Sequence, residues 1–453
     1  LFITFPIYKL DKNIEGTIYE NSVNGIYGAH VAGVYNYYVY DFYDHYLKKE
    51  STDQTDIEKI NEYLKFYEEK EYVNPIDNKT YSVINEFTGI AEGKNLLIIQ
   101  LEAFNNFLIN LKVDGVEITP NLNKLANNSL YYNRFYSSSG IGNTSDCEFS
   151  ALTGLYGNGN DLTIFSASGK NYNTLAKDFS KNNYHTFSFH GNVGDFYHRN
   201  SEHIHTLGFD EFYPLEYFQE NGDAPLIHGY LDDKYFFKEL PKILESKSKF
   251  FGYAISVTSH SPYVPTEEIP QHNFNNLTTL SSSYLDFCHY VDEGIGILIS
   301  EMEERNILDD TVIVLYGDHT SSLFKHDVEG ILDKKLSEVD FRMIMQNVPF
   351  IIYNEDLFPP QVNNKIGSTI DVYRTMANLF GLDQKYHFGN DLLSNEPNMV
   401  YSPRTLDIIL DDSIIFYPTG EVFGKNNNSK KYIDLFNDYK YHNDLILKTK
   451  YFK

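Results

Sequence analysis

The chain has 453 residues, of which 42% are hydrophobic, and a formal net charge of −26 at pH 7. This length and composition are typical of a folded protein with a large core and exclude a wholly disordered chain. The acidic balance excludes broad binding to nucleic acid or to an anionic membrane, so any attraction to an anionic substrate must be local.

Residues 1–92 are predicted to form a lead segment, an exposed arm in front of the main body. Its first residues, Leu1–Tyr8, are apolar and indicate either the exit of a membrane segment or a short strand at an arbitrary boundary. Aromatic residues in 25–45 favour a helix, although a strand has the same composition. A charged helix is expected over 56–72 and a loop over 74–81. No apolar run reaches the roughly 18 residues of a membrane span.

A different pattern begins at Lys94, where apolar runs alternate with amphipathic segments. Such runs predict buried strands, at residues 95–102, 186–190, 250–257, 311–316 and 348–353. The segments between them predict helices, at residues 121–129, 172–182, 280–305 and 369–380. The alternation predicts an α/β domain over 93–395, with a mainly parallel central sheet flanked by helices. Short strands and a helix over 432–448 predict a small α+β subdomain at 396–453.

Polar side chains with metal-binding or acid–base chemistry follow four of these strands. They are Glu102, His190, His260, Asp318 and His319. In an open parallel sheet, ligands bind beyond the carboxyl ends of the strands. Each residue alone also has an ordinary explanation, such as a solvated charge, a loop histidine or a capping aspartate in a turn. Together they indicate a functional site at one edge of the sheet.

The loop at residues 140–149 (GIGNTSDCEF) leads into an apolar-periodic run and therefore predicts the start of a helix. Thr144, Ser145 and Asp146 are all favourable N-cap residues, and Glu148 is placed to complete a capping box. Free N–H groups at a helix start attract anions, so a hydroxyl there would lie beside a bound phosphoryl group. The alternative is an ordinary capped helix.

Glu102, Asp318 and His319 offer oxygen and imidazole ligands, a mixed set that suits Mn²⁺, Mg²⁺ or Zn²⁺. Thr144 would be a fourth ligand. A hydroxyl bound to such an ion loses its proton more easily and becomes a nucleophile near neutral pH.

Five strings resemble the lipoteichoic acid synthase family of the sulfatase and alkaline phosphatase-like superfamily, and they occur in the family's order. They are NLLIIQLEAF (95–104), GIGNTSDCEF (140–149), FHGNVGDFYHRN (189–200), SVTSHSPY (256–263) and YGDH (316–319). The resemblance implies one manganese-type ion, with Mg²⁺ or Zn²⁺ as alternatives, held by Glu102, Thr144, Asp318 and His319. It also implies that Thr144 is the nucleophile.

The same resemblance places His190, Tyr197, Arg199 and His260 around a phosphoglycerol group. A guanidinium gives phosphate a bidentate fork, and His260 could protonate a leaving alkoxide. Two residues depart from the family's usual pattern: Tyr197 stands where tryptophan is usual, and Asn143 where lysine is frequent. These departures bear on the identity of the lipid donor and of the acceptor, and not on the metal chemistry. Cys147 lacks the C/S-x-P-x-R context of sulfate ester hydrolases, which disfavours that activity.

The implied reaction moves glycerol phosphate from a phosphatidylglycerol-type lipid to a glycolipid or a growing polyglycerolphosphate chain. The implied location is extracytoplasmic, with membrane helices anchoring the full-length protein at the membrane surface. Alternatives of the same fold are a phosphoethanolamine transferase, a glycolipid primase and a phosphodiesterase. A non-catalytic polymer-binding domain is a further alternative, and it would not retain stoichiometric metal.

Overall fold

The computed structural model describes residues 54–68, 71–159, 162–383, 388–426 and 428–449. The predictions for Leu1–Tyr8 and for the aromatic stripe at 25–45 lie outside these residues. No helix in the described ranges is long and apolar enough to cross a membrane.

The described part of the lead segment packs on the main body and is not the exposed arm that was predicted. Helix α4 (Gln54–Glu68) confirms the charged helix, while β1 (Glu71–Val73) and β2 (Thr80–Ser82) form a hairpin around the predicted loop. Ile60 and Leu64 of α4 are buried in the main core. The apolar positions of α4 lie one turn apart on one face, and they bury that face although the helix is charged elsewhere.

The central sheet has nine strands, in the order β14-β6-β13-β12-β3-β11-β7-β8 with β15 also paired to β6. Their bounds are β3 Asn95–Leu101, β6 Leu130–Tyr136, β7 His185–His190, β8 Glu211–Tyr213, β11 Phe250–Ile255, β12 Thr311–Gly317, β13 Asn347–Tyr353, β14 Gln361–Asn363 and β15 Gly367–Ser368. All five predicted strands are present.

The sheet is mainly parallel, as predicted, but β13 runs against both of its neighbours, β12 and β6. Every other pairing in the sheet is parallel. A buried apolar run has the same appearance in either direction, so the reversal of β13 has no signal in its own sequence. Strand β6, rich in tyrosine, was not predicted.

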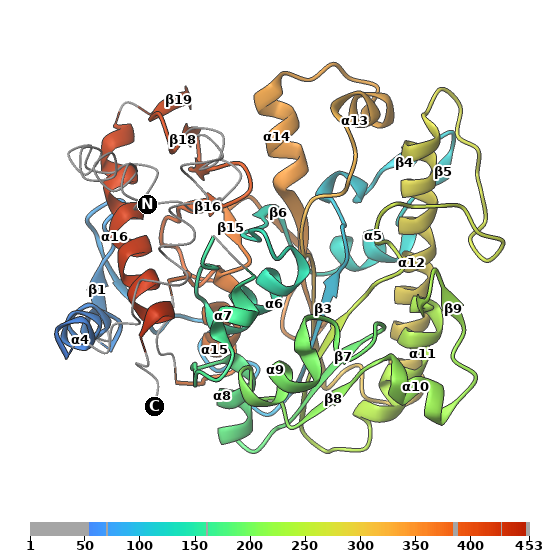
Figure 1. The fold of residues 1–453 in the computed structure, drawn as a ribbon, viewed down its shortest axis with the longest axis horizontal. Coiled ribbons are helices and arrows are strands. Elements are labelled where there is room, and N and C mark those ends of the chain that lie inside the picture. The colour runs from blue at the N-terminus through green and yellow to red at the C-terminus, as the bar shows by residue number, and fades with distance from the viewer. Residues whose placement is uncertain (1–53, 69–70, 160–161, 384–387, 427, 450–453) are drawn as a thin grey trace, which may run out of the picture.

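Helices cover both faces of the sheet, and the side chains of each strand alternate between them (Figure 1). Leu96 and Ile98 of β3 belong to one apolar cluster, while Leu97 and Ile99 belong to another. The first cluster includes residues of α6, α8 and α15, and the second includes residues of α5, α11 and α12. Burial on both faces explains why the strand sequences are continuously apolar.

The helices and short strands around the sheet are α5 Pro120–Asn127, α6 Thr144–Thr153, α7 Thr163–Ala167, α8 Leu175–Lys181, α9 Arg199–His205, α10 Leu215–Asn221, α11 Asp233–Leu244, α12 Thr279–Glu304, α13 Lys325–Leu332, α14 Glu338–Gln346 and α15 Asp371–Leu379, with the hairpins β4 Lys112–Val113 with β5 Val116–Glu117 and β9 Leu226–Ile227 with β10 Tyr230–Leu231. The four predicted helices correspond to α5, α8, α12 and α15.

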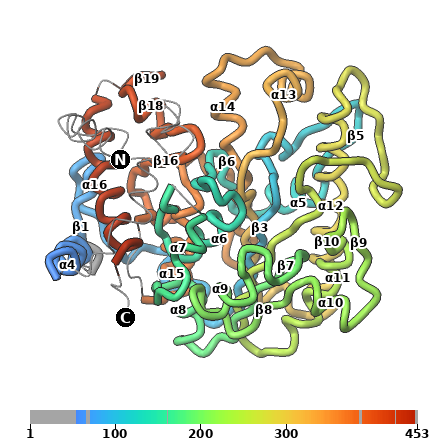
Figure 2. The backbone as a smooth tube through the Cα atoms, in the orientation of Figure 1, coloured from blue at the N-terminus to red at the C-terminus, as the bar shows by residue number. Residues whose placement is uncertain are grey.

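The C-terminal part forms the small α+β subdomain that was predicted. Four antiparallel strands, β16 Val400–Ser402, β17 Asp407–Ile409, β18 Ser413–Phe416 and β19 Glu421–Gly424, precede helix α16, Ser429–Lys448. Helix α16 lies beside α4, so the beginning and the end of the described chain meet on one side of the molecule (Figures 1 and 2). Tyr63 of α4 stacks on His442 of α16 with ring centroids 3.8 Å apart.

Candidate metal centre and active site

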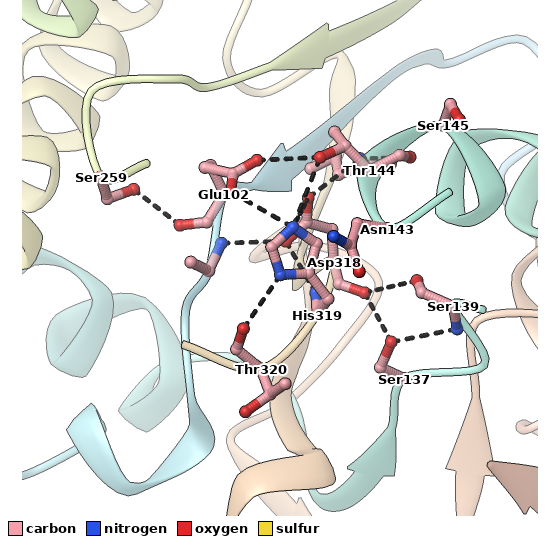
Figure 3. Close-up of polar contacts among 12 residues, drawn as sticks. Glu102, Ser137, Ser139, Asn143, Thr144, Ser145, Ser259, Asp318, His319 and Thr320 are labelled. Atoms are coloured by element: carbon pink, nitrogen blue, oxygen red, sulfur yellow. Dashed lines mark hydrogen bonds and ion pairs between the residues drawn. The ribbon is translucent and has the colours of Figure 1, made fainter. Parts of the chain in front are cut away.

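Three adjacent loops bring four predicted ligands together at the carboxyl edge of the sheet (Figure 3). Glu102 directly follows β3, and Asp318 and His319 directly follow the neighbouring strand β12. Thr144 is the first residue of α6. The parallel pairing of β3 with β12 places their ends side by side, which explains how residues more than 200 positions apart share one site.

The donor atoms of this group surround a common point. Ligand atoms of Glu102, Asp318 and His319 all lie within 4.8 Å of one another. Thr144 Oγ1 lies 3.1 Å from Glu102 Oε2 and 3.4 Å from His319 Nε2. His319 Nε2 is 3.2 Å from Glu102 Oε1 and 3.5 Å from Asp318 Oδ2. Two carboxylates, an imidazole and a hydroxyl in a buried cluster fit a divalent ion.

Hydrogen bonds hold these ligands in position. His319 Nδ1 donates to the Thr320 carbonyl at 3.0 Å, which leaves Nε2 facing the carboxylates. Asp318 Oδ1 accepts from the Ala103 and His319 amides. The Asp318 carbonyl accepts from the hydroxyls of Ser137 and Ser139, drawn with it in Figure 3.

Charges in this cluster shift one another's pKa values. Burial alone would raise the pKa of Glu102, but the attraction of His319 lowers it to about 2. Burial and the charge of Glu102 raise the pKa of Asp318 to about 8. Burial would lower the pKa of His319, but Asp318 and Glu102 raise it to about 9. Near pH 7 protons on Asp318 and His319 therefore balance the charge of Glu102, and a bound divalent cation would displace these protons to leave two carboxylates and a neutral imidazole as ligands.

The start of α6 differs from the predicted cap. Asn143, with φ 43°, is the N-cap residue, and its side chain makes no capping bond. The predicted capping box with Glu148 is wrong, because that carboxylate is buried against Arg199 and His203. Asp146 instead accepts hydrogen bonds from the amides of Gly142, at 2.9 Å, and Thr163, at 3.1 Å. The loop is thereby folded against the first turn of the helix that carries Thr144.

Gln100 of β3 holds the start of α6 in position, a role that the sequence patterns did not predict. Its side-chain amide donates to the Thr144 carbonyl at 3.2 Å and lies 3.4 Å from Asp318 Oδ2. Its side-chain oxygen accepts from the hydroxyls of Tyr253 and Tyr316. A single polar residue inside the apolar run of β3 was the available signal, because a buried amide needs partners.

A cleft of about 400 Å³ opens at the cluster, and Glu102, His260 and His319 are among the residues that line it. His260 is exposed and donates from Nδ1 to the Ser261 carbonyl at 2.6 Å, so Nε2 is free to exchange a proton. Two arginines that the sequence did not indicate, Arg342 and Arg404, line the same cleft.

The other predicted substrate residues, His190, Tyr197 and Arg199, are not among the residues that line this cleft, although the charge of Glu102 acts on both His190 and Tyr197. Burial and the charge of Arg199 lower the pKa of His190 to about 3, so its ring is neutral near pH 7. Its Nδ1 donates to the Ile255 carbonyl at 3.2 Å, which leaves Nε2 as an acceptor. Arg199 pairs with Glu148 through Nε and Nη2, stacks against Tyr197, and keeps a buried Nη1 without a partner among the described residues.

Comparisons with known proteins agree with this geometry. The sulfatase family model matches residues 94–382. The lipoteichoic acid synthase of Staphylococcus aureus (strain USA300) is 32% identical over 359 residues, which cover 76% of this chain and 54% of the relative. The chain therefore spans about half the length of the curated relatives that it matches.

Two solved structures share the fold. The lipoteichoic acid synthase LtaP from Listeria monocytogenes superposes with a TM-score of 0.72 at 26% identity, covering 80% of this chain and 94% of that one. A protein of the alkaline phosphatase superfamily from Vibrio parahaemolyticus gives a TM-score of 0.63 at 16% identity, covering 88% and 95%. The resemblance inferred from the five sequence strings is confirmed by these relatives, and the chain belongs to the sulfatase family.

Proposed function

We propose that this chain is a metal-dependent phosphotransferase that moves glycerol phosphate from a phosphatidylglycerol-type lipid to a glycolipid or a polyglycerolphosphate chain. The observation that carries the proposal is the convergence of Thr144 Oγ1 with Glu102, Asp318 and His319. The similarity of the chain to lipoteichoic acid synthases supports this choice of substrates. The proposed location is outside the cytoplasm, at a membrane surface.

Glu102, Thr144, Asp318 and His319 would hold one divalent ion, with Mn²⁺ as the proposed metal. Such an ion would lower the pKa of the Thr144 hydroxyl, so that its proton is lost to water, and would offset negative charge on the transferred group. The helix start at Thr144 adds N–H groups that favour an anion at the same place.

In the first step, Thr144 Oγ1 attacks the phosphorus of the lipid phosphodiester. The bond to the diacylglycerol oxygen breaks, and His260, which begins the cycle protonated on both ring nitrogens, gives that oxygen the proton on Nε2. The product is glycerol phosphate esterified to Thr144. In the second step, an acceptor hydroxyl gives its proton to His260 Nε2 and attacks the phosphorus, which releases Thr144 Oγ1. His190 and Arg199 are proposed to contact the glycerol phosphate.

The mass of the covalent adduct tests this proposal. The protein, loaded with Mn²⁺, is incubated with a mixture of phosphatidylglycerol and phosphatidylethanolamine, quenched in acid, digested and analysed by mass spectrometry. We expect phosphoglycerol on Thr144 and no adduct in the Thr144→Ala variant. Ser145→Ala is the matched control, because Ser145 lies next in the helix and, among the described residues, its hydroxyl donates to the Gly142 carbonyl and not to the metal cluster.

The control variant is expected to keep the adduct. Turnover at the wild-type rate in Thr144→Ala would overturn the role of that residue. A phosphoethanolamine adduct would instead assign a different donor, and release of glycerol phosphate to water without transfer would indicate a phosphodiesterase.

A further inference from the structure

Arg404 reaches the proposed nucleophile from the C-terminal subdomain. It lies in the turn between β16 and β17, and its Nη1 donates to Asn143 Oδ1 at 3.1 Å. Asn143 directly precedes Thr144. The turn is fixed by a hydrogen bond from the Leu406 amide to the Ser402 carbonyl at 2.9 Å. A residue far along the chain is therefore held beside the first turn of α6.

The charge of Arg404 is available to a ligand. Within the described part of the chain, no carboxylate lies within ion-pair distance of its guanidinium, which is exposed and lines the cleft. The second arginine of the cleft, Arg342, pairs with Asp407 at 3.6 Å. Arg199, the arginine expected to bind phosphate, has its charge paired with Glu148 in a buried contact. The positive charge of Arg404 thus faces the cleft: Asp318 attracts it, but no carboxylate of the described residues forms an ion pair with it.

A bound phosphodiester would need a positive charge in the site besides the metal ion. The two carboxylates of Glu102 and Asp318 would neutralise a divalent ion, so the negative charge of a phosphodiester has no counterpart in the metal cluster. Attack by Thr144 adds charge to the phosphoryl oxygens. In a chain with a net charge of −26, a cation must be local to offset it.

We propose that Arg404 binds the phosphate that Thr144 attacks, with its guanidinium donating to phosphoryl oxygens while Asn143 Oδ1 orients Nη1. This inference rests on the proposed function. It makes the C-terminal subdomain part of the substrate site. Arg404 then supplies the positive charge that a lysine would supply at position 143, where this chain has Asn143. A guanidinium suits this task because its planar fork matches two phosphate oxygens.

The test compares Arg404→Gln, Arg404→Lys and the double variant with Asn143→Lys and Arg404→Gln. Binding of sn-glycerol phosphate and of inorganic phosphate to the Mn²⁺-loaded protein is measured by calorimetry, together with KM for phosphatidylglycerol. A hydrogen-bonded charge is worth roughly tenfold or more in affinity, so Arg404→Gln should weaken binding by at least that factor. Arg404→Lys and the double variant should recover part of the loss.

Lys430→Gln is the matched control, because it removes one exposed charge from the same subdomain, at α16. It should bind as the wild type does. Unchanged phosphate affinity in Arg404→Gln would overturn the inference, as would a loss of Mn²⁺ binding that accounts for the effect. If the wild type forms no adduct on Thr144, the proposed function fails, while the calorimetry still decides whether Arg404 binds phosphate.

Discussion

At the residue scale, Glu148 is a buried charge beside the site that two basic side chains hold in place. Its carboxylate accepts from Arg199 Nε at 3.1 Å and from His203 Nε2 at 2.9 Å, and both partners are buried. Burial alone would raise the pKa of Glu148, but the attraction of Arg199 lowers it to about 2. His203 Nδ1 in turn contacts Ser188 Oγ at 3.0 Å. This network holds α9 against α6.

We expect Glu148→Gln to lose roughly 3–5 kcal/mol of stability at pH 7, because it leaves the buried charge of Arg199 unpaired. In the wild type, the folded-state pKa of Glu148 is about 2, below its ordinary value of 4.5. The folded state therefore binds fewer protons, so this stabilisation is present above pH 4.5 and is lost as the pH falls toward 2.

Urea denaturation from pH 7 to pH 3 measures both effects. Glu148→Gln should show a shallower loss of stability with acid than the wild type. Glu267→Gln, a change at an exposed carboxylate, should stay within about 0.5 kcal/mol of the wild type. Identical acid dependence in Glu148→Gln and the wild type would contradict the prediction.

At the element scale, the end of β12 is set by close backbone contact. A Cβ at Gly317 would lie 2.2 Å from the Phe104 carbonyl oxygen and 2.9 Å from Val348 Cβ. The next residue, Asp318, donates its amide to the Leu101 carbonyl at 3.1 Å. The loop after β3 thus touches the end of β12 where only glycine fits, and this contact aligns Glu102 with Asp318.

Gly317→Ala should push these two strand ends apart. We expect a loss of about 1–3 kcal/mol of stability and weaker Mn²⁺ binding, since the two carboxylates would lose their alignment. Thermal denaturation and metal titration measure the two effects. Gly330→Ala in α13 is the control, because its Cβ would meet only Leu277 Cδ2 at 3.5 Å. Equal behaviour of the two variants would refute the steric explanation.

At the scale of the whole molecule, the three predicted segments share buried contacts. Arg374 of α15 donates to the Tyr72 hydroxyl at 2.8 Å, and the hydroxyl contacts Glu396, which also pairs with Arg374 at 3.4 Å. Tyr401 and Phe436 of the C-terminal subdomain stack with centroids 3.9 Å apart inside the main apolar cluster. We propose that the subdomain boundaries at 92 and 395 do not separate independently folding units.

Phe436→Ala tests whether the three segments unfold together. Removing a fully buried ring should cost about 3–5 kcal/mol, and the loss should lower the stability of the entire chain in one transition. Near-ultraviolet dichroism of tyrosine and release of Mn²⁺ should follow the same unfolding curve. Tyr441→Ala, at an exposed position of the same helix, should change stability little. Two separate transitions, with only one of them shifted, would contradict the prediction.

The sequence by itself determined the features that depend on short-range patterns. Continuous apolar runs identified β3, β7, β11, β12 and β13, because both faces of these strands are buried. Glu102, Asp318 and His319 were found together because they follow parallel strands, whose carboxyl ends meet at one edge. Thr144 was found because glycines and a hydroxyl precede a helical pattern. The ordered motifs then indicated the family.

Only the tertiary structure decided the features that depend on contacts between distant parts of the chain. Arg404 contacts Asn143 across 261 positions, and nothing in its turn indicates that position. The pairing of Glu148 with Arg199 replaced a local capping box with a long-range ion pair. The reversed direction of β13 depends on its partners β12 and β6. Local patterns fix which faces of an element are apolar, whereas packing fixes which elements meet.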